Sequence, residues 1–271
     1  MLAGAWGGHI MPAMRFLLTL TIGVLAASVS AAEFSPAIED NSFLLEEAYN
    51  QGPGVVQHIG TFVHFRTPAT SSELGFTQEW PLHGERHQIS YSLGHAWAEG
   101  AGGDFGDIAI HYRYQLREAS AGLAIAPRLS VFIPTGDDHE GTLQVNLPFS
   151  KRTSHHLALH ANAGATLTRH AASTDRDLLG CHLGASAIGI VTPTLNVMIE
   201  ALVASDQEIT ASGDTERATQ TTLAPGVRFA VNRGDLQIVP GFGVPITFGG
   251  GRTDAGLYLY LSFEHPFKKG R

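Results

Sequence analysis

The feature that most constrains the fold is an alternation of apolar and polar side chains that repeats every two residues along most of the chain. A representative run reads Ile-Ala-Ile-His-Tyr-Arg-Tyr at residues 108–114. Because successive side chains of a β-strand point to opposite faces, this period predicts strands with one apolar and one polar face. About twelve such strands are expected, at residues 55–66, 74–82, 89–97, 108–117, 123–133, 143–149, 157–167, 178–191, 195–203, 220–232, 235–247 and 257–267.

An even number of amphipathic strands, each long enough to cross a bilayer at a tilt, predicts an all-β fold: a transmembrane antiparallel up-and-down β-barrel over residues 54–267. Alternate connections are short, as at 83–86 and 192–194, whereas those at 134–141, 205–216 and 249–255 are longer. Outer-membrane barrels have short periplasmic turns and longer external loops, so both ends of the barrel are expected in the periplasm. A soluble β-sandwich is the alternative fold.

The composition agrees with a barrel and excludes several function classes. Charged residues make up 15% of the chain, against about 25% in soluble domains. The formal charge is −8 and no basic stripe is visible, which argues against a nucleic-acid partner. Cys181 is the only cysteine, so neither an intramolecular disulfide nor a cysteine-based zinc site is expected, and no cofactor is predicted.

The N-terminus has the pattern of an export signal. Arg15 precedes an apolar run at residues 16–27, and Ser-Val-Ser-Ala-Ala follows at residues 28–32. A positive charge, a short apolar run and small residues predict a cleavable signal peptide over residues 1–32, with Met14 as a possible start. No later run of 18 apolar residues occurs, so an exported outer-membrane barrel is expected rather than a helical membrane protein.

Residues 33–53 form a separate N-terminal segment without the two-residue period. Asn41 or Ser42 could cap a short amphipathic helix from Phe43 to Tyr49. This helix could lie under the barrel mouth, plug the lumen or rest on the membrane surface. Prolines also fall inside several expected strands, where they predict bulges or strand ends; they are Pro127, Pro148, Pro225, Pro240, Pro245 and Pro266.

The polar face of the strands is expected to line the lumen. Charges of both signs on that face can brace the barrel or form a constriction that orients a polar solute. Candidates for these roles are Arg66, Asp107, Arg113, Arg117, Arg128, Glu200, Arg228, Asp235, Tyr258, Tyr260 and Glu264. The strand parity places further residues on this same face: Phe62, Phe132, His58, His64, His111, His156, His160 and His182. Histidine is an acceptable polar lining, and its spacing here does not predict a metal site.

Several short stretches resemble a family of outer-membrane barrels labelled "MetA-pathway of phenol degradation" or transporter. They lie at residues 41–51, 54–58, 106–109, 126–129, 143–148 and 259–267 and span nearly the whole expected mature chain. The resemblance implies a transport role linked to aromatic-compound catabolism and brings no catalytic residues. The last strand also resembles the C-terminal signal that the outer-membrane assembly machinery recognises. Here Phe267 is followed by a tail at residues 268–271, which departs from that signal.

The leading hypothesis is therefore a passive outer-membrane channel or transporter for small solutes, surrounded by outer-membrane lipid; the resemblance adds aromatic compounds to the candidate solutes. A structural or binding barrel with a plugged lumen is the second hypothesis. A lipid-modifying enzyme is the third; it is disfavoured because no Gly-x-Ser-x-Gly motif or phosphate loop is present and no set of Ser, His and carboxylate side chains has matching strand parity.

Overall fold

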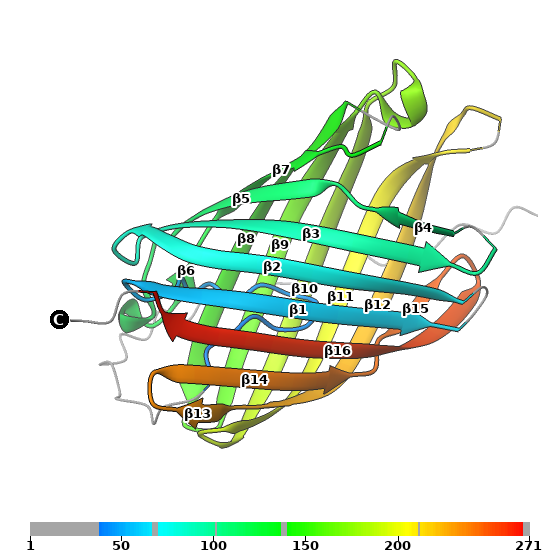
Figure 1. The fold of residues 1–271 in the computed structure, drawn as a ribbon. Coiled ribbons are helices and arrows are strands. Elements are labelled where there is room, and N and C mark those ends of the chain that lie inside the picture. Colours follow the sequence, from blue (N-terminus) through cyan, green and yellow to red (C-terminus); the bar gives the residue numbers. More distant parts are fainter. Residues whose placement is uncertain (1–37, 67–69, 101, 137–139, 211, 268–271) are drawn as a thin grey trace, which may run out of the picture. The chain divides into compact units, whose positions relative to one another are not determined.

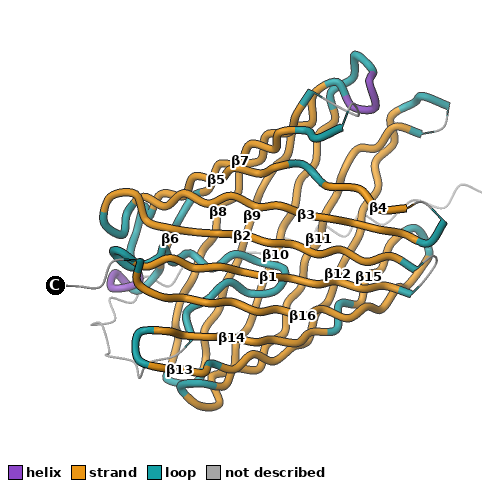
Figure 2. The backbone as a smooth tube through the Cα atoms, viewed as in Figure 1, coloured by secondary structure: helices purple, strands orange, loops and turns teal. Residues whose placement is uncertain are grey.

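The computed structural model describes residues 38–66, 70–100, 102–136, 140–210 and 212–267. The predicted signal peptide at 1–32 and the tail at 268–271 lie outside these ranges. The described chain is almost entirely antiparallel sheet (Figures 1 and 2). Its strands are β1 Val55–Phe65, β2 Ser71–His83, β3 His87–Ala98, β4 Gly102–Phe105, β5 Ile108–Tyr114, β6 Ala124–Ile125, β7 Arg128–Ile133, β8 Gly141–Ser154, β9 Leu157–Arg169, β10 Leu178–Thr192, β11 Leu195–Ile209, β12 Thr215–Phe229, β13 Val231–Arg233, β14 Leu236–Gly243, β15 Ile246–Gly249 and β16 Arg252–Pro266.

The sheet closes on itself because β1 pairs with β16 along its whole length, from Val55 opposite Pro266 to Phe65 opposite Gly256. Four strands are interrupted and appear as two segments each: β4 with β5, β6 with β7, β12 with β13, and β14 with β15. The sixteen segments therefore make a closed barrel of twelve strands. This closure confirms the predicted barrel and excludes the β-sandwich.

The prolines explain two of these interruptions. Pro127 separates β6 from β7, and Pro245 follows the end of β14 at the break before β15. Their carbonyl groups still accept hydrogen bonds, from the Tyr114 amide at 3.0 Å and the Gly256 amide at 2.8 Å. Proline lacks an N–H donor, so the ladder breaks where proline stands while the carbonyl side of the strand stays paired.

Exposed apolar side chains cover the outer wall. Leu74, Ile110, Val145, Leu183 and Val197 are among them, and they come from different strands around the barrel. A wall of this kind fits the hydrocarbon region of a bilayer, whereas a water-soluble protein rarely exposes so continuous an apolar surface. In the described part of the chain, no helix could span a membrane.

The two ends of the barrel differ. The turn end carries the connections at 84–86, 155–156, 193–194 and 234–235 and also the start of β1 and the end of β16. The opposite, loop end is more compact than predicted, because β11 extends to Ile209 and β12 begins at Thr215. The predicted long loop at 249–255 is a tight turn at Gly250 and Gly251, whose positive φ values of 56° and 75° suit glycine.

The predicted facing of β1 is wrong. Phe62 pairs with Leu74 and Leu259, both exposed on the outer wall, so Phe62 also faces outward, together with His58 and His64. Directly opposed residues share a face of the sheet. The inner side of β1 instead carries Gln57, Ile59, Thr61 and Val63. Ile59 belongs to a buried apolar cluster with Ile38 and Phe43, which explains why an apolar residue faces the lumen here.

Candidate functional site: a polar lumen occupied by residues 38–52

Residues 38–52 run inside the barrel at its turn end, visible as the blue loop behind β1 and β16 in Figure 1. They form bends and extended backbone, so the helix predicted from Phe43 to Tyr49 does not exist. Side chains of Phe43, Leu45, Glu47 and Ala48 are buried. Of the three positions considered for this segment, the structure shows the one inside the lumen. We call residues 38–52 the lumen segment.

Side chains of the barrel wall hold the amide groups of the lumen segment. One oxygen of Glu200, Oε2, accepts hydrogen bonds from the Phe43 and Leu44 amides at 2.9 and 3.0 Å. Four further amides donate in the same way: Glu46 to Asn162 Oδ1 at 2.9 Å, Ala48 to Ser150 Oγ at 2.7 Å, Asn50 to Gln115 Oε1 at 3.1 Å and Gln51 to Gln88 Oε1 at 2.7 Å. A helix over residues 43–49 would need the Glu46 and Ala48 amides for the carbonyl groups of Ser42 and Leu44, so these wall contacts compete with helix formation.

Arginines and amides of the wall bind the carbonyl groups of the same segment. Arg228 donates through Nη1 to the carbonyl oxygens of Asp40 and Asn41 at 2.8 and 2.9 Å. Arg113 donates to the carbonyl oxygens of Glu47 and Tyr49 at 3.2 and 2.7 Å. The wall therefore satisfies both donors and acceptors of a non-helical backbone, as buried peptide groups require.

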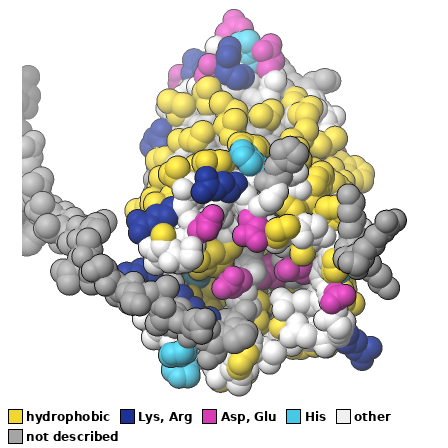
Figure 3. All heavy atoms as spheres, turned by 90° about the vertical axis from the view of Figure 1, so that its left-hand side faces the viewer, with side chains coloured by type: hydrophobic (Ala, Val, Ile, Leu, Met, Phe, Trp, Pro, Cys, Tyr) yellow, Lys and Arg dark blue, Asp and Glu magenta, His cyan; other side chains and the backbone are white. Residues whose placement is uncertain are grey.

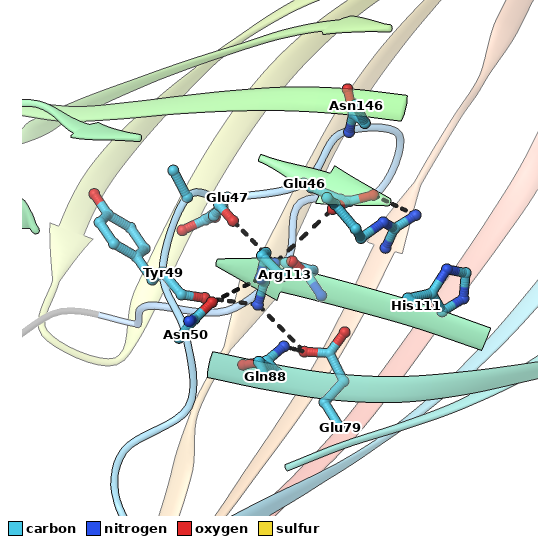
Figure 4. A network of polar contacts seen from close by, with 12 residues as sticks. Glu46, Glu47, Tyr49, Asn50, Glu79, Gln88, His111, Arg113 and Asn146 are labelled. Carbon is cyan, nitrogen blue, oxygen red and sulfur yellow. Dashed lines mark hydrogen bonds and ion pairs between the residues drawn. The ribbon is translucent and has the colours of Figure 1, made fainter. Parts of the chain in front are cut away.

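Buried ion pairs reinforce this contact. Glu47 Oε1 lies 2.9 Å from Nη2 of Arg228, and both side chains are almost fully buried. Glu46 pairs with Arg128 at 2.5 Å and lies 3.9 Å from Arg113 (Figure 4). Breaking one partner of a buried pair leaves an uncompensated charge, which is costly. The segment contributes the acids and the wall contributes the arginines, so the charges match across the contact.

Asp40 fixes the beginning of the segment against β16 and β1. Its carboxylate accepts hydrogen bonds from the Tyr260 and Ser262 hydroxyl groups, both at 2.5 Å, and from the Gln57 amide at 2.6 Å. Gln57 in turn accepts from Gln51 at 2.6 Å, so one wall residue contacts both ends of the segment.

Phe43 occupies a space that glycines leave open. Its ring stacks on Tyr258 with centroids 5.1 Å apart. A Cβ atom at Gly226, Gly241 or Gly243 would lie 2.3, 2.8 or 2.8 Å from the ring. Any side chain at these wall positions would collide with Phe43, so these glycines are part of the seat for the segment.

The structure brings six of the eleven predicted lumen residues to the lumen segment or its immediate seat: Arg113, Arg128, Glu200, Arg228, Tyr258 and Tyr260. Glu264 is half-buried and lines a cavity beside the segment. The remaining four lie elsewhere. Arg66 follows β1 and is exposed, Asp107 stands between β4 and β5, Arg117 is exposed and donates to the Ala121 carbonyl at 2.6 Å, and Asp235 lies in the exposed turn before β14.

Sequence reasoning missed the segment's own acids, Asp40, Glu46 and Glu47, and the uncharged wall residues that bind its backbone. The signal was present in part, since these acids precede a barrel whose inner face carries Arg113, Arg128 and Arg228. The amide partners could not be found in this way, because Phe43 and Glu200 are 157 residues apart in sequence.

A cavity of about 150 Å³ remains at the turn end, lined by both the lumen segment and the wall. Glu39, Asp40, Glu47, Glu79 and Glu264 contribute carboxyl groups to it. Figure 3 views this end and shows acidic side chains near the middle of the face, with hydrophobic side chains over the flanks. Burial raises the pKa of Glu39, and the Glu47 carboxylate raises that pKa further. Within the described residues, no group of three or more His, Cys, Asp or Glu is arranged to hold a metal ion.

Comparison with known proteins gives the fold a context. No protein-family model and no curated protein matches the chain. The crystal structure of an outer membrane channel from Pseudomonas putida F1 is similar, with a TM-score of 0.62 and 12% identity, covering 84% of this chain and 99% of that channel. The NanC porin has a TM-score of 0.53 and 8% identity, covering 77% of this chain and 98% of the porin.

The shared feature is the barrel fold. At these identities the likeness carries no residue roles from one protein to another. The resemblance to the MetA-pathway family remains a prediction from the sequence.

Proposed function

We propose that this protein is an outer-membrane channel for small solutes and that the lumen segment controls the width of its turn end. The observation that carries the proposal is the contrast between an apolar outer wall and a polar inner wall in a closed twelve-stranded barrel. The likeness in fold to an outer membrane channel and a porin supports it. In this proposal the turn end faces the periplasm, where short turns and both ends of the barrel domain are usual.

The position of the lumen segment makes a narrowed or closed resting state the expected one. Its buried ion pairs and captured backbone occupy the turn-end half of the lumen. Solutes would pass through the space beside it or after its release. A link to aromatic compounds is part of the proposal and rests on the sequence resemblance alone.

Conductance across planar bilayers, with liposome swelling for uncharged solutes, tests this function. Purified wild-type protein should give small steps, and a variant lacking residues 39–52 should give steps severalfold larger. If neither protein conducts or admits any small sugar, phenol or aromatic acid, the channel proposal is wrong. Conductance by the deletion variant alone would instead support a barrel that is plugged at rest.

One outer-wall contact keeps a lipid hydrolase as the second candidate. His64 Nδ1 lies 2.8 Å from Ser72 Oγ, and both residues face outward by their register with Leu257 and Trp97. A histidine that accepts the proton of a serine hydroxyl is the core of serine-based acyl transfer. Incubating the protein with phospholipid in mixed micelles checks this candidate; release of fatty acid that is lost in Ser72→Ala would support it.

A further inference from the structure

The loop-end half of the lumen differs in charge from the turn-end half. On the described strands, six carboxylate residues face inward there: Glu73, Asp104, Asp206, Glu208, Glu216 and Asp254. We call this part of the lumen the acidic vestibule. It is distinct from the seat of the lumen segment, where Asp40, Glu46 and Glu47 have arginine, hydroxyl or amide partners.

The strand register establishes that these six residues point inward. Asp206 and Glu208 have the same parity on β11 as Glu200, and the pairing of β11 with β12 continues without a bulge to Ile209. Glu216 has the parity of the inward-facing Arg228 on β12. Side chains two residues apart on a strand share a face. By the same rule Asp254 shares the inner face of Tyr258 on β16. Glu73 lies opposite Val63, which is on the inner side of β1, and opposite Ala96, so Glu73 also faces inward.

Two of these carboxylates are direct neighbours. Glu208 on β11 lies opposite Glu216 on β12 in the register. Like charges directly opposite each other destabilise a strand pair unless cations or solvent screen them. This arrangement therefore favours the presence of a cation at the inner wall.

Compensating positive charge is scarce in the same half. Among the Lys and Arg residues of the described strands there, Arg252 alone faces inward, and it stands at the first position of β16. His182 also faces inward, opposite Gly164 and Ala204. The inner-wall arginines that contact the lumen segment, Arg113, Arg128 and Arg228, are at the other end.

An apolar hollow adjoins the carboxylates. A cavity of about 330 Å³ lies at the loop end and is lined by Val63, Phe65, Ala96 and Ala98 together with Glu73 and Asp104. Ala96 is directly opposite both acids in the register, Glu73 on β2 and Asp104 on β4. A hollow with apolar walls and two acids on the strands either side of β3 suits a small molecule that has an apolar body and a positive group.

We propose that the acidic vestibule makes the channel select small organic cations, such as amines with an apolar or aromatic body, over anions of the same size. The inference rests on the proposed channel function and gives that function a solute class. Rings of acidic side chains select cations because they raise the local cation concentration and repel anions, and the effect is strongest at low salt.

Reversal potentials in planar bilayers under an about tenfold KCl gradient at low ionic strength test the selectivity. Wild-type protein should prefer K⁺ over Cl⁻. The variant E208Q/E216Q and the variant E73Q/D104N should each lose part of this preference, seen as a reversal potential shifted toward that of Cl⁻. Glu118→Gln is the matched control, because Glu118 is an exposed acid at the turn end. A wild-type preference for Cl⁻, or variants that match the wild type, would overturn the proposal.

Two solutes of similar shape and opposite charge distinguish this inference from the channel proposal. Liposome influx of benzylammonium should exceed that of benzoate, and E73Q/D104N should reduce the difference. If no protein conducts, the channel proposal fails, and binding in detergent then decides the inference. Benzylammonium must bind wild-type protein more tightly than benzoate and more tightly than it binds E73Q/D104N; equal affinities overturn the acidic vestibule as a selective element.

Discussion

Glu47 and Arg228 form an ion pair of 2.9 Å between residues 181 positions apart in sequence. It joins the lumen segment to the wall strand β12. The arginine is fully buried and also holds the carbonyl oxygens of Asp40 and Asn41. One wall side chain therefore connects charge pairing with recognition of the segment's backbone.

Replacing Arg228 with Met should release the lumen segment, because it leaves the Glu47 carboxylate buried without its cation. The cost of such an orphaned charge is about 3–5 kcal/mol. Chymotrypsin should then cut after Phe43 or Tyr49 in the folded barrel, as seen by mass spectrometry. The double variant E47Q/R228M should recover much of the protection; cleavage as fast as in R228M would show that the ion pair does not hold the segment.

Gly226→Ala should disturb the segment at a second place. The added Cβ would stand 2.3 Å from the Phe43 ring, which must move. Single-channel conductance should rise or become noisier, while heat-modifiable migration on gels keeps the form of a folded barrel. Gly136→Ala is the control, since a Cβ there meets no atom within 4 Å. Equal conductance in the two variants would contradict a glycine-dependent seat.

Removing the carboxylate of Glu200 should weaken the segment without changing the barrel. Glu200→Ala deletes the acceptor of the Phe43 and Leu44 amides. A hydrogen bond of this kind contributes about 0.5–1.5 kcal/mol. Hydrogen exchange of residues 43–44 should accelerate, while exchange in β3 stays slow. Unchanged protection at both amides would show that Glu200 is not their main support.

An arginine on the outer wall should impair membrane insertion. Leu183 is 63% exposed near the middle of β10. Lys or Arg at such a lipid-facing position costs about 2–4 kcal/mol at the bilayer midplane. Leu183→Arg should lower the yield of folded protein in liposome refolding and its midpoint in urea, relative to Leu183→Ala. Equal midpoints would mean that this wall does not face hydrocarbon.

The loop between β9 and β10 should loosen in acid. The backbone amide of His170 donates to the exposed Asp177 carboxylate at 3.2 Å and lowers the Asp177 pKa, and Arg169 adds to the effect from 3.0 Å. Because the folded pKa lies below the ordinary carboxyl value of about 4, this contribution is complete above that value and disappears as pH falls through the folded pKa. Loop proteolysis by pepsin should rise across that range, and Asp177→Asn should remove the pH dependence.

The strands were predictable because their pairing leaves a local signature: apolar side chains such as Ile110 and Val145 alternate with polar ones. This alternation is weakest in β10. Its inner face holds Gly180 and Gly184, which make room for Asp206 and Leu45, so small residues there reflect close approach rather than a loop. The prediction of which face of β1 lines the lumen is wrong because the apolar residues Ile59 and Val63 pack against the buried core inside the lumen rather than facing lipid.

The lumen segment was beyond sequence reasoning for a different reason. Its amphipathic pattern favours a helix locally, but tertiary partners supply better acceptors for its amides than its own carbonyl groups do. Those partners come from distant strands such as β3, β8, β9 and β11. Local propensity predicts a structure only where no side chain from a distant strand competes for the backbone amides. The barrel strands meet this condition, and their two-residue period therefore predicted them.

Gly226, Glu200, Arg113 and Arg228 face the lumen segment in the occupied barrel, and the same surfaces would meet the passing solute once the segment withdraws. In the proposed channel, closure and solute contact at the turn end therefore depend on the same residues, so one substitution would change both. The acidic vestibule at the loop end shares none of these residues. In the proposed channel its charges can therefore change to suit another solute without altering the contact between the lumen segment and the wall.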